Sequence, residues 1–156
     1  MTRLLGIDLG ERRVGLALAD RDGSAARPLV TIRRTASLDG DAAAIRTIVD
    51  RYDIDELIVG LPLEASGAEG PQSTSTRAWA AAIAERLARP VALRDERLTS
   101  HLAETRLGPM KRGRSGGPPS KTQRDAYRAR VDREAASIIL QDELDARSVA
   151  SRETGP

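Results

Sequence analysis

The sequence contains no cysteine and no phenylalanine. The absence of cysteine excludes disulfides, thiolate metal ligands and a cysteine nucleophile. Trp79, Tyr52 and Tyr127 are the only large aromatic residues, which argues against nucleic-acid modules that stack bases on aromatic platforms. Several common classes of catalytic and recognition site are thereby excluded.

Long apolar stretches are also missing. No run approaches the ~20 apolar residues that a membrane helix needs, and no signal-peptide pattern opens the sequence, so we expect a cytoplasmic protein. At 156 residues the chain is long enough for one domain with a proper core. We expect that domain to span residues 1–145 and the tail, residues 146–156, to be disordered.

Positive charge is unevenly distributed along the chain. The formal net charge is +2, but the segment 106–133 holds nine Lys or Arg and two Asp residues, so it carries +7 and the remainder −5. Such a segment is typical of a protein that binds a phosphate backbone; a solvated arginine-rich loop without a partner has the same composition. Because residues 113–119 are rich in Gly and Pro, we expect residues 106–130 to form a flexible basic loop.

Apolar runs separated by turn residues predict an α/β fold. Strands are expected over residues 4–9, 14–19, 28–33, 57–59 and 90–94. Helices are expected from Asp39 or Asp41 to Arg51, after the Gly/Pro loop 60–71, from Thr99 to Leu107 with Thr99 as N-cap, and over residues 131–144. Three consecutive strands followed by strand–helix alternation imply a mixed five-stranded sheet with helices on both faces.

Two aspartates occupy positions that favour apolar residues. Asp8 interrupts the apolar run 4–9, where a buried carboxylate is costly unless a cation, a metal or several hydrogen bonds compensate it. Asp132 shares a face of the last predicted helix with Ala135, Ala136, Ile139 and Leu140. An acid that complements the helix dipole also explains Asp132, but its place on the apolar face favours a carboxylate directed toward the core.

A third acidic position follows the predicted strand 90–94. Asp95 and Glu96 stand at a strand end, where open α/β folds place their chemistry. Neighbouring strand residues face opposite sides of a sheet, so only one of the two can share a face with Asp8, and the pattern does not distinguish them. Three carboxylates without a histidine or cysteine partner suit Mg²⁺ or Mn²⁺, and two such ions can cleave a phosphodiester bond.

Four motifs, in order along nearly the whole chain, resemble those of a known family. They are Gly6-Ile7-Asp8-Leu9-Gly10 with Arg13-Val14-Gly15, Val59-Gly60-Leu61-Pro62, Asp95-Glu96-Arg97-Leu98-Thr99, and Val131-Asp132 followed by Ala135-Ala136. The sequence is similar to the RuvX/YqgF family of bacterial RNase H-like proteins. That family is described as Holliday-junction-resolvase-like and as nucleases of the pre-16S rRNA 5′ end.

The resemblance implies an RNase H-like fold and a metal-dependent nuclease that processes the 5′ end of pre-16S rRNA. Matched motif by motif, its catalytic and metal-binding residues are Asp8, Glu96 and Asp132, which selects Glu96 over Asp95. The implied cofactor is Mg²⁺ or Mn²⁺ in a two-metal site, and the implied partner is structured RNA. A homodimer is left open, and no membrane is expected.

Five basic residues are candidates for substrate contacts. Arg13 lies at the predicted hairpin turn near Asp8, and Arg97 adjoins Glu96, where it can neutralise an acid or a scissile phosphate. The predicted basic loop adds Lys111, Arg112 and Arg114. Two alternatives to the rRNA nuclease stay open: the same chemistry on branched DNA, as in a Holliday-junction resolvase, and a non-catalytic nucleic-acid-binding module. The three carboxylates argue against the non-catalytic binding module.

Overall fold

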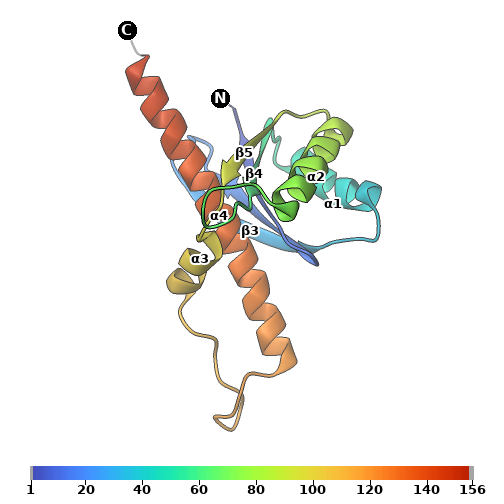
Figure 1. Cartoon of the computed structure of the whole chain (residues 1–156), viewed down its shortest axis with the longest axis vertical. Helices are drawn as coiled ribbons and strands as arrows, with labels where there is room; N and C mark the ends of the chain where they lie inside the picture. The colour runs from blue at the N-terminus through green and yellow to red at the C-terminus, as the bar shows by residue number, and fades with distance from the viewer. Residues whose placement is uncertain (1, 155–156) are drawn as a thin grey trace.

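The computed structural model describes residues 2–154 and consists of a five-stranded sheet covered by helices (Figure 1). The strands are β1 (Leu4–Leu9), β2 (Arg13–Ala19), β3 (Ala26–Arg33), β4 (Glu56–Leu61) and β5 (Val91–Asp95). The helices are α1 (Leu38–Arg51), α2 (Pro71–Leu87), α3 (Thr99–Leu107) and α4 (Lys121–Glu153). Within residues 2–154, no helix has the length and apolar character needed to cross a lipid bilayer.

The sheet is mixed, as the sequence predicts. Its strand order is β3-β2-β1-β4-β5. The first three strands form antiparallel hairpins, whereas β1, β4 and β5 run parallel. The parallel connections pass through α1 and α2, which is the usual way to join parallel strands.

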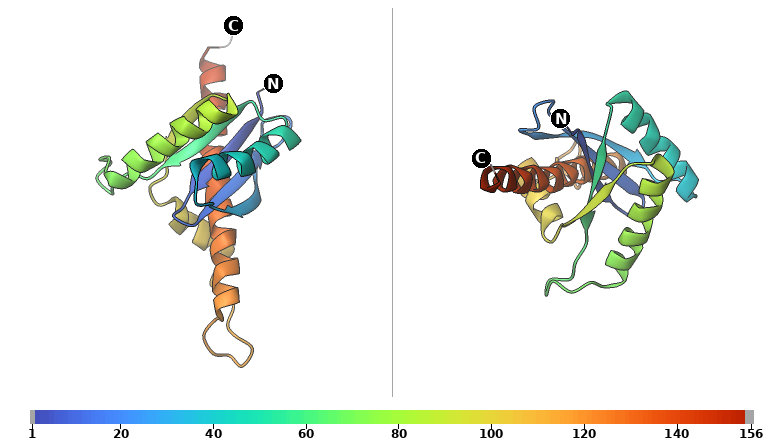
Figure 2. Two further views of the ribbon diagram at one scale, coloured as in Figure 1. Left: turned by 90° about the vertical axis from the view of Figure 1, so that its right-hand side faces the viewer. Right: turned by 90° about the horizontal axis from the view of Figure 1, so that it is seen from above.

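Because side chains alternate along each strand, the two faces of the sheet pack against different layers of helices (Figure 2). Leu5 and Ile7 of β1 pack in a core with α1 and α2, while Leu4 of β1 and Ile58 of β4 pack with α4. Helix α3 packs on α4 in a small separate cluster. Helices therefore cover both faces, which confirms the expected α/β architecture.

Helix α4 is longer than predicted at both ends. It begins at Lys121 because Ser120 and Gln123 form a capping box, so residues 121–130 are helical and the loop is limited to residues 108–120. It continues to Glu153, and Arg147 pairs there with Glu56 at 2.8 Å and with Glu143 at 2.9 Å. The prediction of a loop over 106–130 is therefore wrong for residues 106–107 and 121–130, and the prediction of a disordered tail is wrong for residues 146–153. Residues 155–156 lie outside the described part of the chain.

Two helix N-caps and the end of one strand also differ from the prediction. The N-cap of α1 is Ser37, whose hydroxyl accepts a hydrogen bond from the Gly40 N–H at 3.0 Å, and neither Asp39 nor Asp41 serves. Helix α3 covers Thr99–Leu107 as predicted, but its N-cap is Leu98, with a φ of 63° and no side-chain cap, and not Thr99. Strand β4 continues through Gly60 and Leu61, which were expected to begin a loop.

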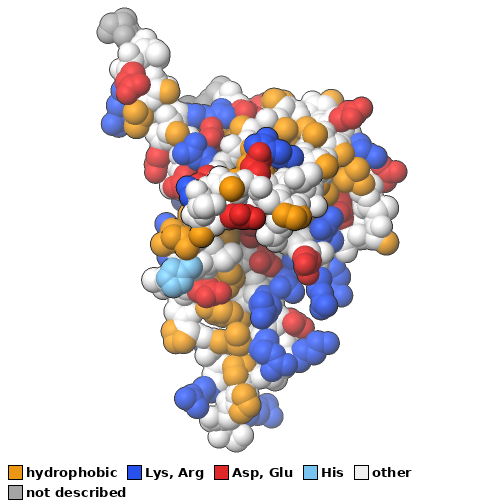
Figure 3. Space-filling model, in the orientation of Figure 1, with side chains coloured by type: hydrophobic (Ala, Val, Ile, Leu, Met, Phe, Trp, Pro, Cys, Tyr) orange, Lys and Arg blue, Asp and Glu red, His pale blue; other side chains and the backbone are white. Residues whose placement is uncertain are grey.

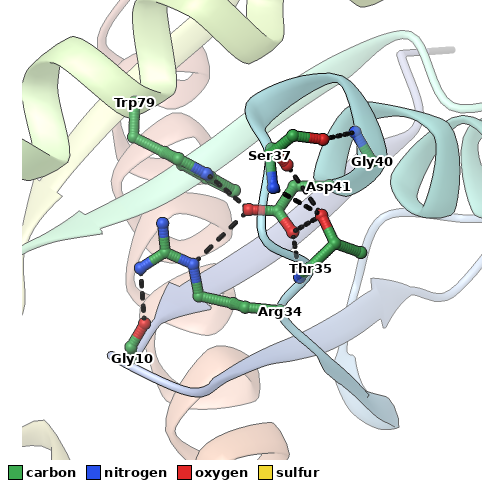
Figure 4. A network of polar contacts seen from close by, with 7 residues as sticks. All are labelled: Gly10, Arg34, Thr35, Ser37, Gly40, Asp41 and Trp79. Atoms are coloured by element: carbon green, nitrogen blue, oxygen red, sulfur yellow. Dashed lines mark hydrogen bonds and ion pairs between the residues drawn. The ribbon is translucent and has the colours of Figure 1, made fainter.

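Asp41 does not cap α1 because it anchors a polar network (Figure 4). Its carboxylate accepts hydrogen bonds from the Thr35 N–H at 2.7 Å, and from Arg34 Nε and Trp79 Nε1 at 3.4 Å each. Although burial opposes ionisation, these hydrogen bonds hold the pKa of Asp41 below its usual value. Arg34 also donates to the carbonyl of Gly10 at 3.1 Å, so the network fixes the turn that follows β1.

Candidate active site

Asp8 stands on the face of the sheet that α4 covers, because Leu4, Gly6 and Asp8 are every second residue of β1 and so share one face. A Cβ added at Gly6 would lie 2.7 Å from the carbonyl oxygen of Ala136, so α4 passes directly over β1. Asp8 lies two residues after Gly6, near the carboxyl end of the strand. This is the sheet edge where α/β folds place their chemistry.

Glu96 reaches Asp8 across an intervening strand. Strand β4 lies between β1 and β5, and a Cβ added at Gly60 of β4 would stand 2.4 Å from Glu96 Oε2. The Glu96 N–H donates to the carbonyl of Leu61 at 3.1 Å, which extends the pairing of β4 and β5 by one residue. Gly60 thus leaves the space through which the Glu96 carboxyl contacts Asp8.

Asp95 points to the other side of the sheet. It shares a face of β5 with Val91 and Leu93, which pack against the layer of α1 and α2. Its carboxylate is exposed and accepts hydrogen bonds from the Arg97 Nε and N–H, both at 2.9 Å. Those bonds hold the pKa of Asp95 below its usual value. The structure therefore brings Glu96, and not Asp95, to Asp8.

Helix α4 carries Asp132 to the same edge of the sheet. A Cβ added at Gly15 of β2 would lie 2.1 Å from the carbonyl oxygen of Asp132, so this turn of the helix rests directly on the strand. The Thr31 hydroxyl of β3 donates to the carbonyl of Ala129. The Asp132 carboxylate accepts a hydrogen bond from Arg13 Nε at 2.8 Å.

The carboxyl groups of Asp8 and Glu96 share a hydrogen bond. Burial raises the pKa of Glu96 to about 9, and the charge and hydrogen bond of Asp8 add to the shift. Burial also raises the pKa of Asp8 to about 6, although the hydrogen bond from Glu96 opposes that shift. Burial and mutual repulsion therefore favour one proton held between the two carboxyl groups. Perturbed carboxyl groups of this kind are typical of functional sites.

The donor chemistry of Asp8, Glu96 and Asp132 fits a hard divalent cation, because all three offer carboxylate oxygens. In residues 2–154, no group of three or more His, Cys, Asp or Glu side chains is arranged to hold a metal ion as it stands. One proton between Asp8 and Glu96, and the guanidinium of Arg13 on Asp132, offset the charge that a metal ion would otherwise neutralise.

The five predicted substrate contacts lie in three places. Arg13 touches Asp132. Arg97 binds the outward-facing Asp95 and donates to the carbonyl of Ala65 at 3.3 Å. The remaining three lie in the loop between α3 and α4: Lys111, Arg112 and Arg114.

Two residues that build this site were missed by sequence reasoning. Gly60 was assigned to a loop, yet its missing side chain lets Glu96 cross β4, and Gly15 lets α4 rest on β2. One signal was available for Gly60. A glycine that directly continues the apolar run Leu57-Ile58-Val59 often marks a close approach of other atoms to a strand.

The fold has a solved counterpart. It is similar to a structure of T. thermophilus RuvC in complex with a Holliday junction substrate, with a TM-score of 0.54, 16% sequence identity and coverage of 96% of this chain and 97% of that chain. A second structure of RuvC from the same organism gives a TM-score of 0.53 at 15% identity. The fold defines the class: α/β proteins with an RNase H-like fold, here with three acidic side chains at one edge of the sheet.

Sequence relatives narrow that class to one family. The family model RuvX, described as Holliday junction resolvase, matches residues 2–146. A relative from Anaeromyxobacter dehalogenans (strain 2CP-C), named "Putative pre-16S rRNA nuclease", is 41% identical over 146 residues, which cover 94% of this chain and 98% of the relative. A relative of the same name from Thermobifida fusca (strain YX) is 43% identical, with coverage of 90% and 86%. The chain belongs to the RuvX family, as its motifs indicated.

Proposed function

We propose that this chain is a divalent-metal-dependent nuclease that acts in the cytoplasm on the 5′ end of pre-16S rRNA. The observation that carries the proposal is the convergence of Asp8, Glu96 and Asp132, from β1, the end of β5 and α4, at one edge of the sheet. The names of the relatives support the choice of substrate.

In this proposal, Asp8, Glu96 and Asp132 hold Mg²⁺ or Mn²⁺ in a two-metal site. When bound, such ions activate a water and stabilise the oxygen that leaves the phosphorus. The residues of the chain set the conditions for binding. Glu96 gives up the proton that it shares with Asp8, and Asp132 exchanges the guanidinium of Arg13 for the cation.

Release from Asp132 gives Arg13 a second role. Its guanidinium then lies beside the carboxylates without a partner, where it can bind the scissile phosphate through two parallel hydrogen bonds. Arg97, Lys111, Arg112 and Arg114 remain predicted substrate contacts farther along the nucleic acid. A resting ion pair between Arg13 and Asp132 thus keeps both groups positioned before substrate arrives.

Branched DNA is the second candidate substrate. The family description and the solved RuvC complex both refer to Holliday junctions, and phosphodiester chemistry at three carboxylates is the same for RNA and DNA. The relatives at about 41% identity carry the rRNA name, whereas the RuvC likeness at 16% identity concerns the fold. We therefore place rRNA first.

The test is a cleavage assay that offers a pre-16S RNA leader and a four-way DNA junction to the same protein, with Mn²⁺, with Mg²⁺ and with a chelator. We expect metal-dependent cleavage of the RNA. The Asp8→Asn variant serves as the control for contaminating nucleases. Cleavage of the junction alone would transfer the function to branched DNA, and binding without cleavage of either substrate would leave a binding module.

A further inference from the structure

A groove runs between the open edge of the sheet and the first turns of α4. It encloses about 970 Å³. Arginines 12, 13, 33 and 34 line it on the sheet side, and Lys121, with small residues of α4, lines it on the helix side. Figure 3 shows Lys and Arg side chains gathered around the lower part of α4, beside the lower end of the sheet.

Three cations of this groove have no counter-ion within the described part of the chain. Arg12, Arg33 and Lys121 are exposed, and none of them pairs with a carboxylate there, whereas Arg13 and Arg34 are held by Asp132 and Asp41. Strand pairing and backbone hydrogen bonds bring two of the three together, because Arg33 is the register partner of Arg13 and the Arg34 N–H donates to the carbonyl of Arg12.

The groove carries a net positive charge. Of its five lining cations, Arg13 and Arg34 are already paired with Asp132 and Asp41, and the other three outnumber the two lining acids, Glu11 and Asp125. Like charges held close together by the fold repel one another, and an anionic ligand would relieve that repulsion.

The helical wall of the groove leads to the carboxylates. Thr122, Ala126 and Ala129 line one side of the groove, and Arg13, which lines its other side, binds the Asp132 carboxylate at 2.8 Å. The helix rises about 16 Å from Lys121 to Asp132. Its small side chains let a polymer backbone lie close to the helix, and none of the lining residues is aromatic, so no base-stacking platform is present.

We infer that this groove binds the phosphodiester backbone of one nucleic-acid strand beside the scissile phosphate and leads it along α4 to the carboxylates. The inference rests on the proposed nuclease function. It assigns backbone recognition to Arg12, Arg33 and Lys121, which are not among the five substrate contacts predicted above. Because phosphates carry no sequence information, the groove binds without base preference.

The experiment compares two triple variants with equal loss of charge, both in the Asp8→Asn background so that no substrate is cut. The groove variant is Arg12→Gln, Arg33→Gln, Lys121→Gln. The control variant, Arg21→Gln, Arg51→Gln, Arg152→Gln, removes exposed arginines outside the groove lining. Fluorescently labelled single strands of mixed sequence, as RNA and as DNA, and the corresponding duplexes are titrated over a range of salt concentrations.

We expect the groove variant to bind at least about tenfold more weakly at 0.1 M salt. The plot of log K against log salt should flatten by about 2–3, since each phosphate that the protein neutralises contributes about 0.7–0.9 to the slope. The control should change the slope by less than about 1. The charge-conserving variant Arg12→Lys, Arg33→Lys, with native Lys121, should retain most of the slope.

Equal slopes for the groove and control variants would overturn the inference, as would a loss of binding confined to one base sequence. Similar reductions for RNA and DNA would support backbone recognition, and the comparison of single strands with duplexes identifies which form enters. A different result would show that the proposed nuclease function fails while the groove assignment holds. A wild-type protein that binds through the groove but cuts no substrate would contradict the proposed activity and leave the groove assignment in place.

Discussion

At the scale of single residues, the three carboxylates are balanced by partners from within the chain. Glu96 holds a proton that it shares with Asp8, and Asp132 holds the guanidinium of Arg13. Clustered acids repel one another unless each charge is offset. In the proposed nuclease, a bound cation takes the place of this proton and of this arginine.

Replacement of Asp8 by Asn should abolish metal-dependent cleavage while the fold is retained. The amide keeps the shape of the side chain and removes a charge that is buried beside Glu96 and Asp132. Because desolvation of that charge is costly, the metal-free variant should be at least as stable as the wild type. Cleavage rates and thermal unfolding of the purified variant check both expectations; full activity would remove Asp8 from the site.

The shared proton predicts how the stability of the metal-free protein depends on pH. The pKa of Glu96 rises from 4.5 to about 9 on folding, so between these values the folded state binds more protons than the unfolded chain. Stability must then fall as pH rises through this window. The Glu96→Gln variant lacks this titration, so its unfolding temperature should decline less between about pH 5 and pH 9 when both are measured with a chelator. Parallel curves for the two proteins would contradict the shared proton.

At the scale of elements, close packing between α4 and the sheet positions the site. Gly6 and Gly15 each bring a strand against the backbone of α4, with an added Cβ at 2.7 Å from Ala136 and 2.1 Å from Asp132. Backbone atoms cannot rotate away as a side chain can. Side chains at these two glycines would therefore displace the helix that carries Asp132.

Substitution of Gly15 by Ala should destabilise the protein by at least about 1–3 kcal/mol, because the new methyl group overpacks the interface with α4. The same change at Gly117, where an added Cβ meets nothing within 4 Å, should alter stability by no more than about 0.5 kcal/mol. Chemical denaturation of both variants measures the difference. Equal stabilities would mean that α4 does not pack against β2 as closely as described.

At the scale of the whole molecule, charge is concentrated around the first half of α4. The loop that precedes α4 adds Lys111, Arg112 and Arg114, which are exposed and form no ion pair with a described residue. The loop has its own hydrogen bonds, including Arg112 to the carbonyl of Gly116 at 3.1 Å. Nucleic acid should therefore approach the molecule from this side.

Neutralisation of Lys111, Arg112 and Arg114 together should weaken binding to all sequences about equally. Each phosphate that the variant no longer neutralises should flatten the salt slope by about 0.7–0.9, and kcat at saturating substrate should persist because the carboxylates are untouched. Salt titrations of binding, with kcat and KM for the same variant, provide the measurement. An unchanged slope would show that this loop is solvated and does not touch phosphate.

The sequence by itself determined the strands and the two-sided helical cover, and it pointed to two candidate site carboxylates. Apolar runs specify buried strands through their periodicity, and an acid within such a run, as at Asp8, is conspicuous because its burial is costly. The capping box at Ser120 and Gln123 was also readable. It was missed because Gly and Pro residues just before it indicated a loop.

Only the tertiary structure decided which residues meet. The residue pattern left Asp95 and Glu96 open, and the motif resemblance favoured Glu96. Which of the two faces Asp8 depends on the register of β5 relative to β4, since a shift of one residue exchanges the faces of a strand. The roles of Gly15 and Gly60 depend on what lies opposite them, α4 in one case and Glu96 in the other. The groove joins residues 12 and 33 to residue 121, and no local pattern encodes that meeting because it arises from packing between elements far apart in the sequence.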